Sequence, residues 1–119
     1  MVMTKKQMQR IEEKIKEIGN AAISTLIEKN RSYGGSALSP IRVFSKLDPE
    51  QAIRVRIDDK ICRVLHGNEN AFGEDALWDL VGYFILLLVV RELKKEGFYD
   101  EKNSAVSTSI SAPYRMYED

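Results

Sequence analysis

Two aspartates one helical turn apart give the first indication of chemistry in this sequence. Asp75 and Asp79 lead into a strongly apolar run, Leu80 to Val90. Residues four apart share a helical face, so both carboxylates would point at the same neighbouring element. Two carboxylates on one face are the minimum for holding a hard divalent cation such as Mg²⁺ or Mn²⁺, which keeps several waters and takes further ligands from phosphates.

A second polar stripe lies on the preceding predicted helix, and it is mostly cationic. Arg56, Lys60 and Arg63 follow one another at helical spacing, with Asp59 among them. Guanidinium groups form paired hydrogen bonds to phosphate oxygens and lysine adds a point charge, so the three cations suit a phosphorylated ligand. Asp59 would orient these cations. The same charges could instead form a solvated salt-bridge network, which is common on helices.

Three helices must position these residues. Apolar residues at alternating steps of three and four predict a long amphipathic helix from Thr4 to about Asn30, whose seam would pack on another helix or on a second subunit. Asp48 and Pro49 begin a second helix, and Gly67 would end it near residue 66. The third helix follows Gly73 and is apolar on every face, so we expect it to be the central buried helix.

The expected fold class is therefore all-α, a small bundle of three main helices, which we expect to form an oligomer. Residues 1–97 would form the helical domain and residues 98–119 a serine-rich C-terminal tail. A short antiparallel turn between residues 67 and 73 would bring the cationic stripe against the acidic pair. The expected buried arc of the second helix comprises Ile53, Ile57, Ile61, Val64 and Leu65.

Composition narrows the classes of function. The chain has 119 residues, enough for one domain, and its 18 basic residues balance 18 acidic ones. This balance gives no bulk charge for coating nucleic acid or anchoring to a membrane. A single cysteine excludes an internal disulfide, no signal peptide is recognised, and the cytoplasm is the expected compartment. Cys62 and His66 lie one turn apart and could form a nucleophilic pair, although nothing else in the sequence supports one.

Aromatic residues lie close to both polar stripes. Tyr33 stands at the Gly34–Gly35 loop after the first helix, and loops on rigid scaffolds commonly carry binding residues. A simple connector is the alternative for this loop. Trp78 and Tyr83 flank the acidic stripe, where core packing is the expected role, although a base could stack on either ring.

Four segments in a fixed order resemble a known family. They are KNRSYGGS from Lys29, VFSK from Val43, RIDDKICRV from Arg56 and GEDALWDLVGYFILL from Gly73. In this order they resemble the phage-associated "nucleotide modification associated domain" family of type one, over about half of the chain. The resemblance implies an all-helical fold, a phage or prophage origin and a role in nucleotide or base metabolism.

The last two predicted helices are more distantly similar to the all-α nucleoside triphosphate pyrophosphatases, the group of MazG and the dimeric dUTPases. Those enzymes hold Mg²⁺ with an E-E-x-x-E motif on one helix and E-x-x-D on the next. The matching positions are Asp58, Asp59 and Cys62, then Glu74 or Asp75 with Asp79. Cys62 replaces a carboxylate and the second pair is spaced by four instead of three. These departures suit gripping phosphates better than activating a water.

The predicted function is to bind or sequester a nucleotide without turnover, and the ligand could be a cyclic nucleotide or a nucleotide signal of host defence. The protein is expected to act as a homo-oligomer in the cytoplasm of the infected host. The expected ligand-binding residues are Lys29, Asn30, Tyr33, Gly34, Arg56, Asp59, Lys60 and Arg63. Asp75 and Asp79 would hold either Mg²⁺ or Mn²⁺, or the cations of the second helix. The alternative is a Mg²⁺- or Mn²⁺-dependent nucleotide pyrophosphohydrolase, and a third hypothesis is a purely structural bundle. Neither a membrane nor nucleic acid is an expected partner.

Overall fold

The computed structural model describes residues 2–73 and 75–99. Its elements are α1 (Lys5–Ser32), α2 (Pro49–Leu65), the short 3-10 helix η1 (Ala71–Gly73) and α3 (Ala76–Lys95). Within these ranges there is no strand, so the expected all-α fold with three main helices is confirmed. None of the helices described is long and apolar enough to cross a membrane. The expected C-terminal tail lies outside the described residues from position 100 onwards.

Local capping interactions begin the helices where the sequence predicts. The Thr4 hydroxyl accepts from the Gln7 backbone N–H at 3.1 Å, and the Gln7 side chain accepts from the Thr4 N–H at 2.9 Å. The Asp48 carboxylate accepts from the Gln51 N–H at 2.9 Å, with Pro49 in the first turn. These bonds satisfy backbone donors that have no partner inside the helix.

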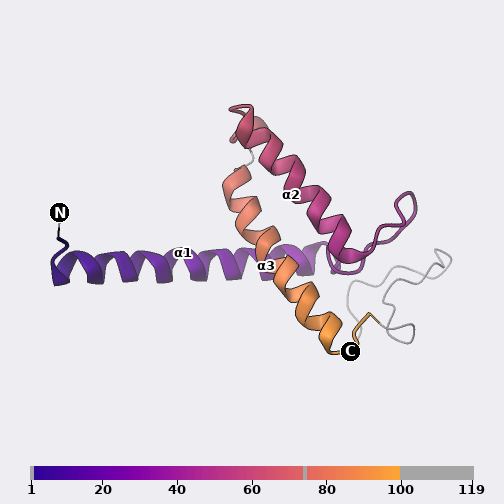
Figure 1. Cartoon of the computed structure of the whole chain (residues 1–119), viewed down its shortest axis with the longest axis horizontal. Helices are drawn as coiled ribbons and strands as arrows, with labels where there is room; N and C mark the ends of the chain where they lie inside the picture. The colour runs from indigo at the N-terminus through magenta and orange to yellow at the C-terminus, as the bar shows by residue number, and fades with distance from the viewer. Residues whose placement is uncertain (1, 74, 100–119) are drawn as a thin grey trace.

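The helices form a hairpin crossed by a long arm (Figure 1). α2 and α3 are joined through η1 and pack along each other, while α1 crosses α3 near its own C-terminal end. The N-terminal half of α1 extends away from the hairpin, and the molecule is 61 Å long. Its radius of gyration is 17.8 Å, whereas a compact domain of this length would have about 13 Å.

The core lies between α2 and α3. Ile53 and Ile57 of α2 pack with Leu86 and Val90 of α3, and all four side chains are buried. α1 reaches this core through Leu26, whose Cδ1 lies 3.4 Å from the position that a Cβ on Gly82 would take. A side chain beginning at position 82 would thus meet Leu26 at van der Waals distance, so α1 packs directly against this turn of α3.

The linker between α1 and α2 has no regular structure, as its composition predicts. Gly34 and Gly35 both have positive φ, at 63° and 74°, which turns the chain sharply after α1. The linker is tied to the turn that follows α3, because the Tyr99 hydroxyl donates to the Leu38 carbonyl at 2.8 Å. Burial raises the pKa of the Tyr99 hydroxyl above its usual value.

Two expectations about burial are wrong. The outer end of the expected α2 arc is exposed, with Leu65 at 77%, because α1 packs on α3 and leaves that end of α2 uncovered. α3 is not buried on every side either, since α1 and α2 cover two of its faces. The third face presents four exposed side chains at helical spacing, Leu77, Val81, Phe84 and Leu88.

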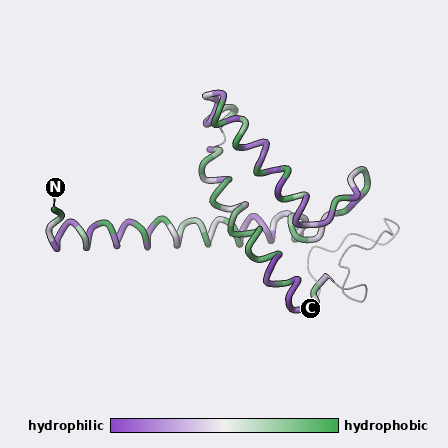
Figure 2. The backbone as a smooth tube through the Cα atoms, viewed as in Figure 1, coloured by the Kyte–Doolittle hydropathy of each residue, from purple (hydrophilic) through white to green (hydrophobic). Residues whose placement is uncertain are grey.

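The apolar seam of α1 is covered along half of its length. Ala22 is buried and Leu26 half-buried where α1 crosses α3. Further towards the N-terminus the seam continues through Met8, Ile11, Ile15 and Ile18, and all four are exposed. In the hydropathy view, apolar residues recur along the projecting part of α1 (Figure 2).

Candidate functional site

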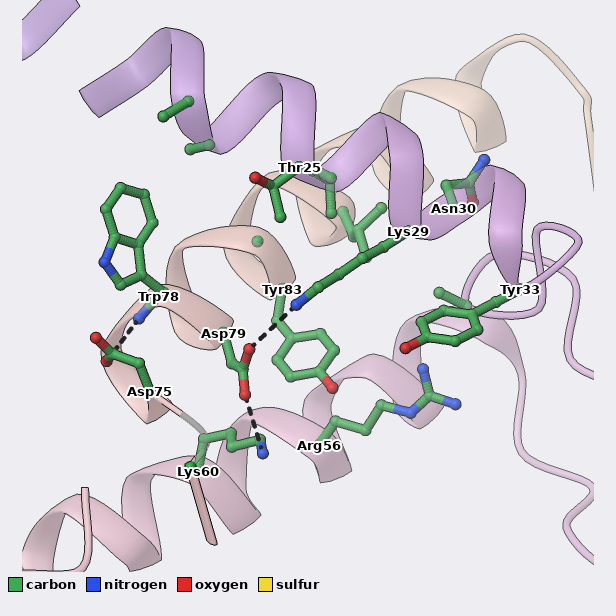
Figure 3. A pocket seen from close by; sticks show the side chains of 17 residues that line it. Thr25, Lys29, Asn30, Tyr33, Arg56, Lys60, Asp75, Trp78, Asp79 and Tyr83 are labelled. Carbon is green, nitrogen blue, oxygen red and sulfur yellow. Dashed lines mark hydrogen bonds and ion pairs between the residues drawn. The ribbon is translucent and has the colours of Figure 1, made fainter. Parts of the chain in front are cut away.

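A pocket of about 660 Å³ lies where the three helices meet. α1 forms one wall, α3 a second, and Arg56 and Lys60 of α2 reach in from a third side (Figure 3). Its volume falls within the range typical of small-molecule sites. Of the predicted site residues, seven line it: Lys29, Asn30, Tyr33, Arg56, Lys60, Asp75 and Asp79.

Asp79 is the electrostatic centre of the pocket. Its Oδ2 lies 3.1 Å from Lys60 Nζ of α2, and its Oδ1 lies 3.6 Å from Lys29 Nζ of α1. Lys60 and Asp79 are 15% and 20% exposed, so their attraction is only partly screened by water. The predicted meeting of the cationic stripe with the acidic pair therefore occurs through this contact.

Asp75 has a different task from Asp79. Its Oδ1 accepts from the backbone N–H groups of Leu77 at 3.0 Å and Trp78 at 3.3 Å, which caps the N-terminus of α3. The carboxylate satisfies donors that the helix leaves unpaired, and its charge is favourable at the positive end of the helix dipole.

Aromatic rings stand at both ends of the pocket. Tyr33 lies next to Arg56 at one end, and Trp78 stands at the other, with the charged groups and Tyr83 between them (Figure 3). Trp78 is 44% exposed, so part of its side chain is accessible and is not buried in the core. This separation of flat apolar faces from a charged centre suits a ligand with an aromatic part and an anionic part.

Three predicted ligand-binding residues do not line the pocket. Arg63 donates from Nη2 to the Ala71 carbonyl at 2.8 Å and thereby fastens α2 to η1. Asp59 is exposed on α2, and Gly34 contributes to the turn after α1 through its backbone bond to the Arg31 carbonyl. Their roles in ligand contact stay predictions that the pocket geometry does not support.

The side-chain geometry supports neither a metal cluster of three ligands in the described residues nor a Cys62–His66 nucleophilic pair. Within residues 2–73 and 75–99, no three His, Cys, Asp or Glu side chains cluster in a way that could hold a metal ion. Cys62 Sγ lies 3.5 Å from His66 Nδ1, but that nitrogen also lies 2.7 Å from the Cys62 carbonyl. A carbonyl only accepts, so this contact requires the proton on Nδ1, and a protonated Nδ1 cannot remove a proton from the thiol.

Small residues of the pocket wall were not predicted as part of a site. They are Ala21, Ala22 and Thr25 of α1 and Gly82 of α3. The signal for them is a change in side-chain size along the α1 seam, from isoleucines at 11, 15 and 18 to alanine at 22. Small side chains at a helix crossing leave space that large ones would fill.

Comparisons with protein-family models, with curated proteins and with solved structures found no match to this chain. The resemblance to the nucleotide modification associated domain family stays a prediction.

Proposed function

We propose that this chain binds a nucleotide in the pocket and holds it without hydrolysing it. The observation that carries the proposal is that one pocket holds three cations from two helices, Lys29, Arg56 and Lys60, and that both lysines pair with the Asp79 carboxylate. These three cations outnumber the two acids of the lining, Asp75 and Asp79, so the pocket is net positive. Phosphate oxygens are the natural counterions for such a site.

The aromatic residues support a nucleotide over a simpler phosphate ester. Tyr33 and Trp78 lie on opposite sides of the charged centre (Figure 3). The base of a nucleotide could therefore stack on one ring while the phosphates of the same nucleotide reach Lys29 and Lys60. Stacking on an aromatic side chain is tolerant of base identity and contributes about 1–3 kcal/mol per base.

Binding without turnover is supported by what the carboxylates already contact. The Asp75 carboxylate is engaged by two backbone donors of α3, and Asp79 is engaged by two lysines. A metal-dependent hydrolase needs carboxylates directed at a cation that activates water or clamps phosphate. Here both acids already contact protein groups, and a ligand phosphate would compete with Asp79 for the two lysines.

A nucleotide panel tests this proposal. The purified chain is titrated calorimetrically with mono-, di-, tri- and cyclic nucleotides, and each mixture is then denatured and chromatographed. Recovery of intact ligand from a complex supports sequestration, whereas release of pyrophosphate or a monophosphate contradicts it. Absence of binding to every member would favour the purely structural bundle.

Arg56→Ala and Arg54→Ala form a matched pair for the same titration. Both arginines are exposed on α2, but Arg56 lines the pocket while Arg54 pairs with Glu50 at 3.5 Å. Loss of a phosphate-binding guanidinium should weaken affinity by about ten- to a hundredfold in Arg56→Ala. Arg54→Ala should bind as the unaltered chain does, and equal losses in both variants would contradict the assignment.

The alternative function is a Mg²⁺- or Mn²⁺-dependent nucleotide pyrophosphohydrolase. It is favoured by one observation, namely that Asp75 and Asp79 both line the pocket one turn apart. Under this alternative, turnover depends on the divalent ion and is abolished by EDTA. The family resemblance supports a phage or prophage origin for either function, and a nucleotide signal of host defence as the ligand of a sequestering, homo-oligomeric protein.

A further inference from the structure

Two exposed apolar surfaces of similar length run along this molecule. The first, which we call the α1 arm, consists of Met8, Ile11, Ile15 and Ile18. The second, the α3 stripe, consists of Leu77, Val81, Phe84 and Leu88. The side chains follow one another at steps of three and four in both, which is the spacing of helices that pack side by side. At 1.5 Å per residue, the arm is about 15 Å long and the stripe about 16 Å.

The arm continues a surface that packs inside the chain. Ala22 and Leu26 follow Ile15 and Ile18 on the same side of α1, and α3 covers that part. A shallow groove of about 690 Å³ follows the uncovered part and is lined by Ile11, Ile15 and Ile18 among others. The whole seam therefore has the residue pattern of a helix–helix contact, but α3 covers only its C-terminal half in the described structure.

The arm also needs a partner for its own stability. In the described chain α1 packs against α3, at its C-terminal end, and the N-terminal turns project alone (Figure 1). Two exposed i,i+3 ion pairs, Arg10–Glu13 and Lys14–Glu17, support these turns. Such pairs contribute only a few tenths of a kcal/mol each, and isolated helical segments of this length are marginal in water.

We propose that a second copy of this chain covers both surfaces, with the arm of each copy packed on the α3 stripe of the other. A reciprocal contact about a twofold axis satisfies both surfaces at once, whereas pairing arm with arm would leave the stripe exposed. The exposed fractions correspond to roughly 350 Å² on the arm and roughly 400 Å² on the stripe. Two symmetric contacts would bury about 1,500 Å² in all, within the range of stable dimers.

This arrangement places the second copy beside the pocket. The arm runs directly into Ala21, Ala22 and Thr25, which form the α1 wall. Trp78, next to Leu77 at the start of the stripe, lines the same pocket and is partly exposed. The dimer contact therefore borders the site, although it depends on apolar complementarity alone and does not rest on the proposed nucleotide binding.

Sedimentation equilibrium and native mass spectrometry of the full chain without added nucleotide test the assembly. A dimer at micromolar concentration supports the proposal, and a monomer throughout that range overturns it. Because no ligand is present, this result is separate from success or failure of the nucleotide titrations.

Ile18→Lys and Ile23→Lys provide a matched pair. Both residues lie on α1 with nearly equal exposure, 52% and 51%, but Ile23 is off the seam. Ile18→Lys should raise the dimer dissociation constant at least about thirtyfold, since a charge replaces an apolar anchor in each of two contacts. Leu88→Lys on the stripe should act similarly. Ile23→Lys should leave the constant unchanged, and an equal effect of both α1 variants overturns the proposal.

Cross-linking distinguishes the two ways of pairing. Chains carrying Ile15→Cys and chains carrying Phe84→Cys, each with Cys62→Ser, are mixed and treated with a short bismaleimide. A cross-linked species formed only in the mixture supports packing of arm on stripe. Cross-linking of Ile15→Cys chains with each other, or no cross-link in the mixture, overturns it.

Discussion

Replacing Asp79 by asparagine should have opposite effects on folding and on ligand binding. In the folded chain the carboxylate is 3.1 Å from Lys60 Nζ and 3.6 Å from Lys29 Nζ. Breaking a fully buried pair costs several kcal/mol, but Lys29 is 52% exposed and its contribution is largely screened. We therefore expect Asp79→Asn to lower the free energy of unfolding by about 1–2 kcal/mol.

The same substitution should strengthen the binding of a phosphorylated ligand. A phosphate held by Lys29 and Lys60 would sit roughly 5 Å from the Asp79 carboxylate, where repulsion between unit charges is about 1 kcal/mol in water and about 3 kcal/mol at an effective dielectric of 20. Removing that charge also ends the competition between Asp79 and the ligand for the two lysines. The expected gain of about 1–2 kcal/mol lowers the dissociation constant roughly five- to thirtyfold.

Isothermal titration at low salt measures the affinity, and urea unfolding without ligand measures the stability. Asp75→Asn is the control, because asparagine caps a helix about as well as aspartate and the carboxylate that pairs with the two lysines is that of Asp79. Its affinity should be nearly unchanged. Weaker binding in Asp79→Asn, or an equal loss in both variants together with dependence on Mg²⁺, would refute this reasoning and favour a pair of metal ligands.

Three further predictions concern stability. The Tyr99 hydroxyl donates to the Leu38 carbonyl, and burial raises its pKa in the folded chain above 10.0, so the stability it contributes is constant below pH 10 and falls as pH rises through the raised pKa. Tyr99→Phe should remove that alkaline fall and lower the free energy of unfolding by about 1 kcal/mol at neutral pH. Urea unfolding at a series of pH values measures both effects. Phe72 is fully exposed at a positive φ of 60°, so Phe72→Gly should leave every contact in place and raise the free energy of unfolding by up to about 1 kcal/mol. Asp48→Ala removes the cap on Gln51 and should lower that free energy by about 1 kcal/mol, with a matching fall in thermal midpoint by circular dichroism.

The helix starts were predictable because caps act over three or four residues. Asp48 and Pro49 together specify a first turn regardless of what packs against it. Burial was less predictable because it depends on how many neighbours a helix has. The apolar residues of α3 predict a helix that is covered on all sides, but the described part of the chain supplies two neighbouring helices, and Phe84 and Leu88 are exposed on its third face.

The contact between Lys60 and Asp79 could be predicted because a short turn forces α2 and α3 to run alongside each other. The orientation of α2 about its own axis was harder to predict, since residues three apart on one stripe can face different neighbours. Arg63 reaches the carbonyl of Ala71 where a ligand contact was predicted. Lys29 could not be placed from periodicity, because its position depends on α1 crossing α3 at Gly82.

The α1 helix connects the two proposals through one change in residue size. Along a single face, large side chains up to Ile18 give way to Ala22, and beyond it Lys29 reaches the pocket. Where the side chains are large, the face forms a surface that requires a second helix to cover it. Where they are small, the crossing with α3 leaves a cavity that charged residues can enter. A ligand in that cavity and a second copy on the arm would thus contact adjacent turns of the same helix, so each should stabilise the orientation of α1 that the other requires.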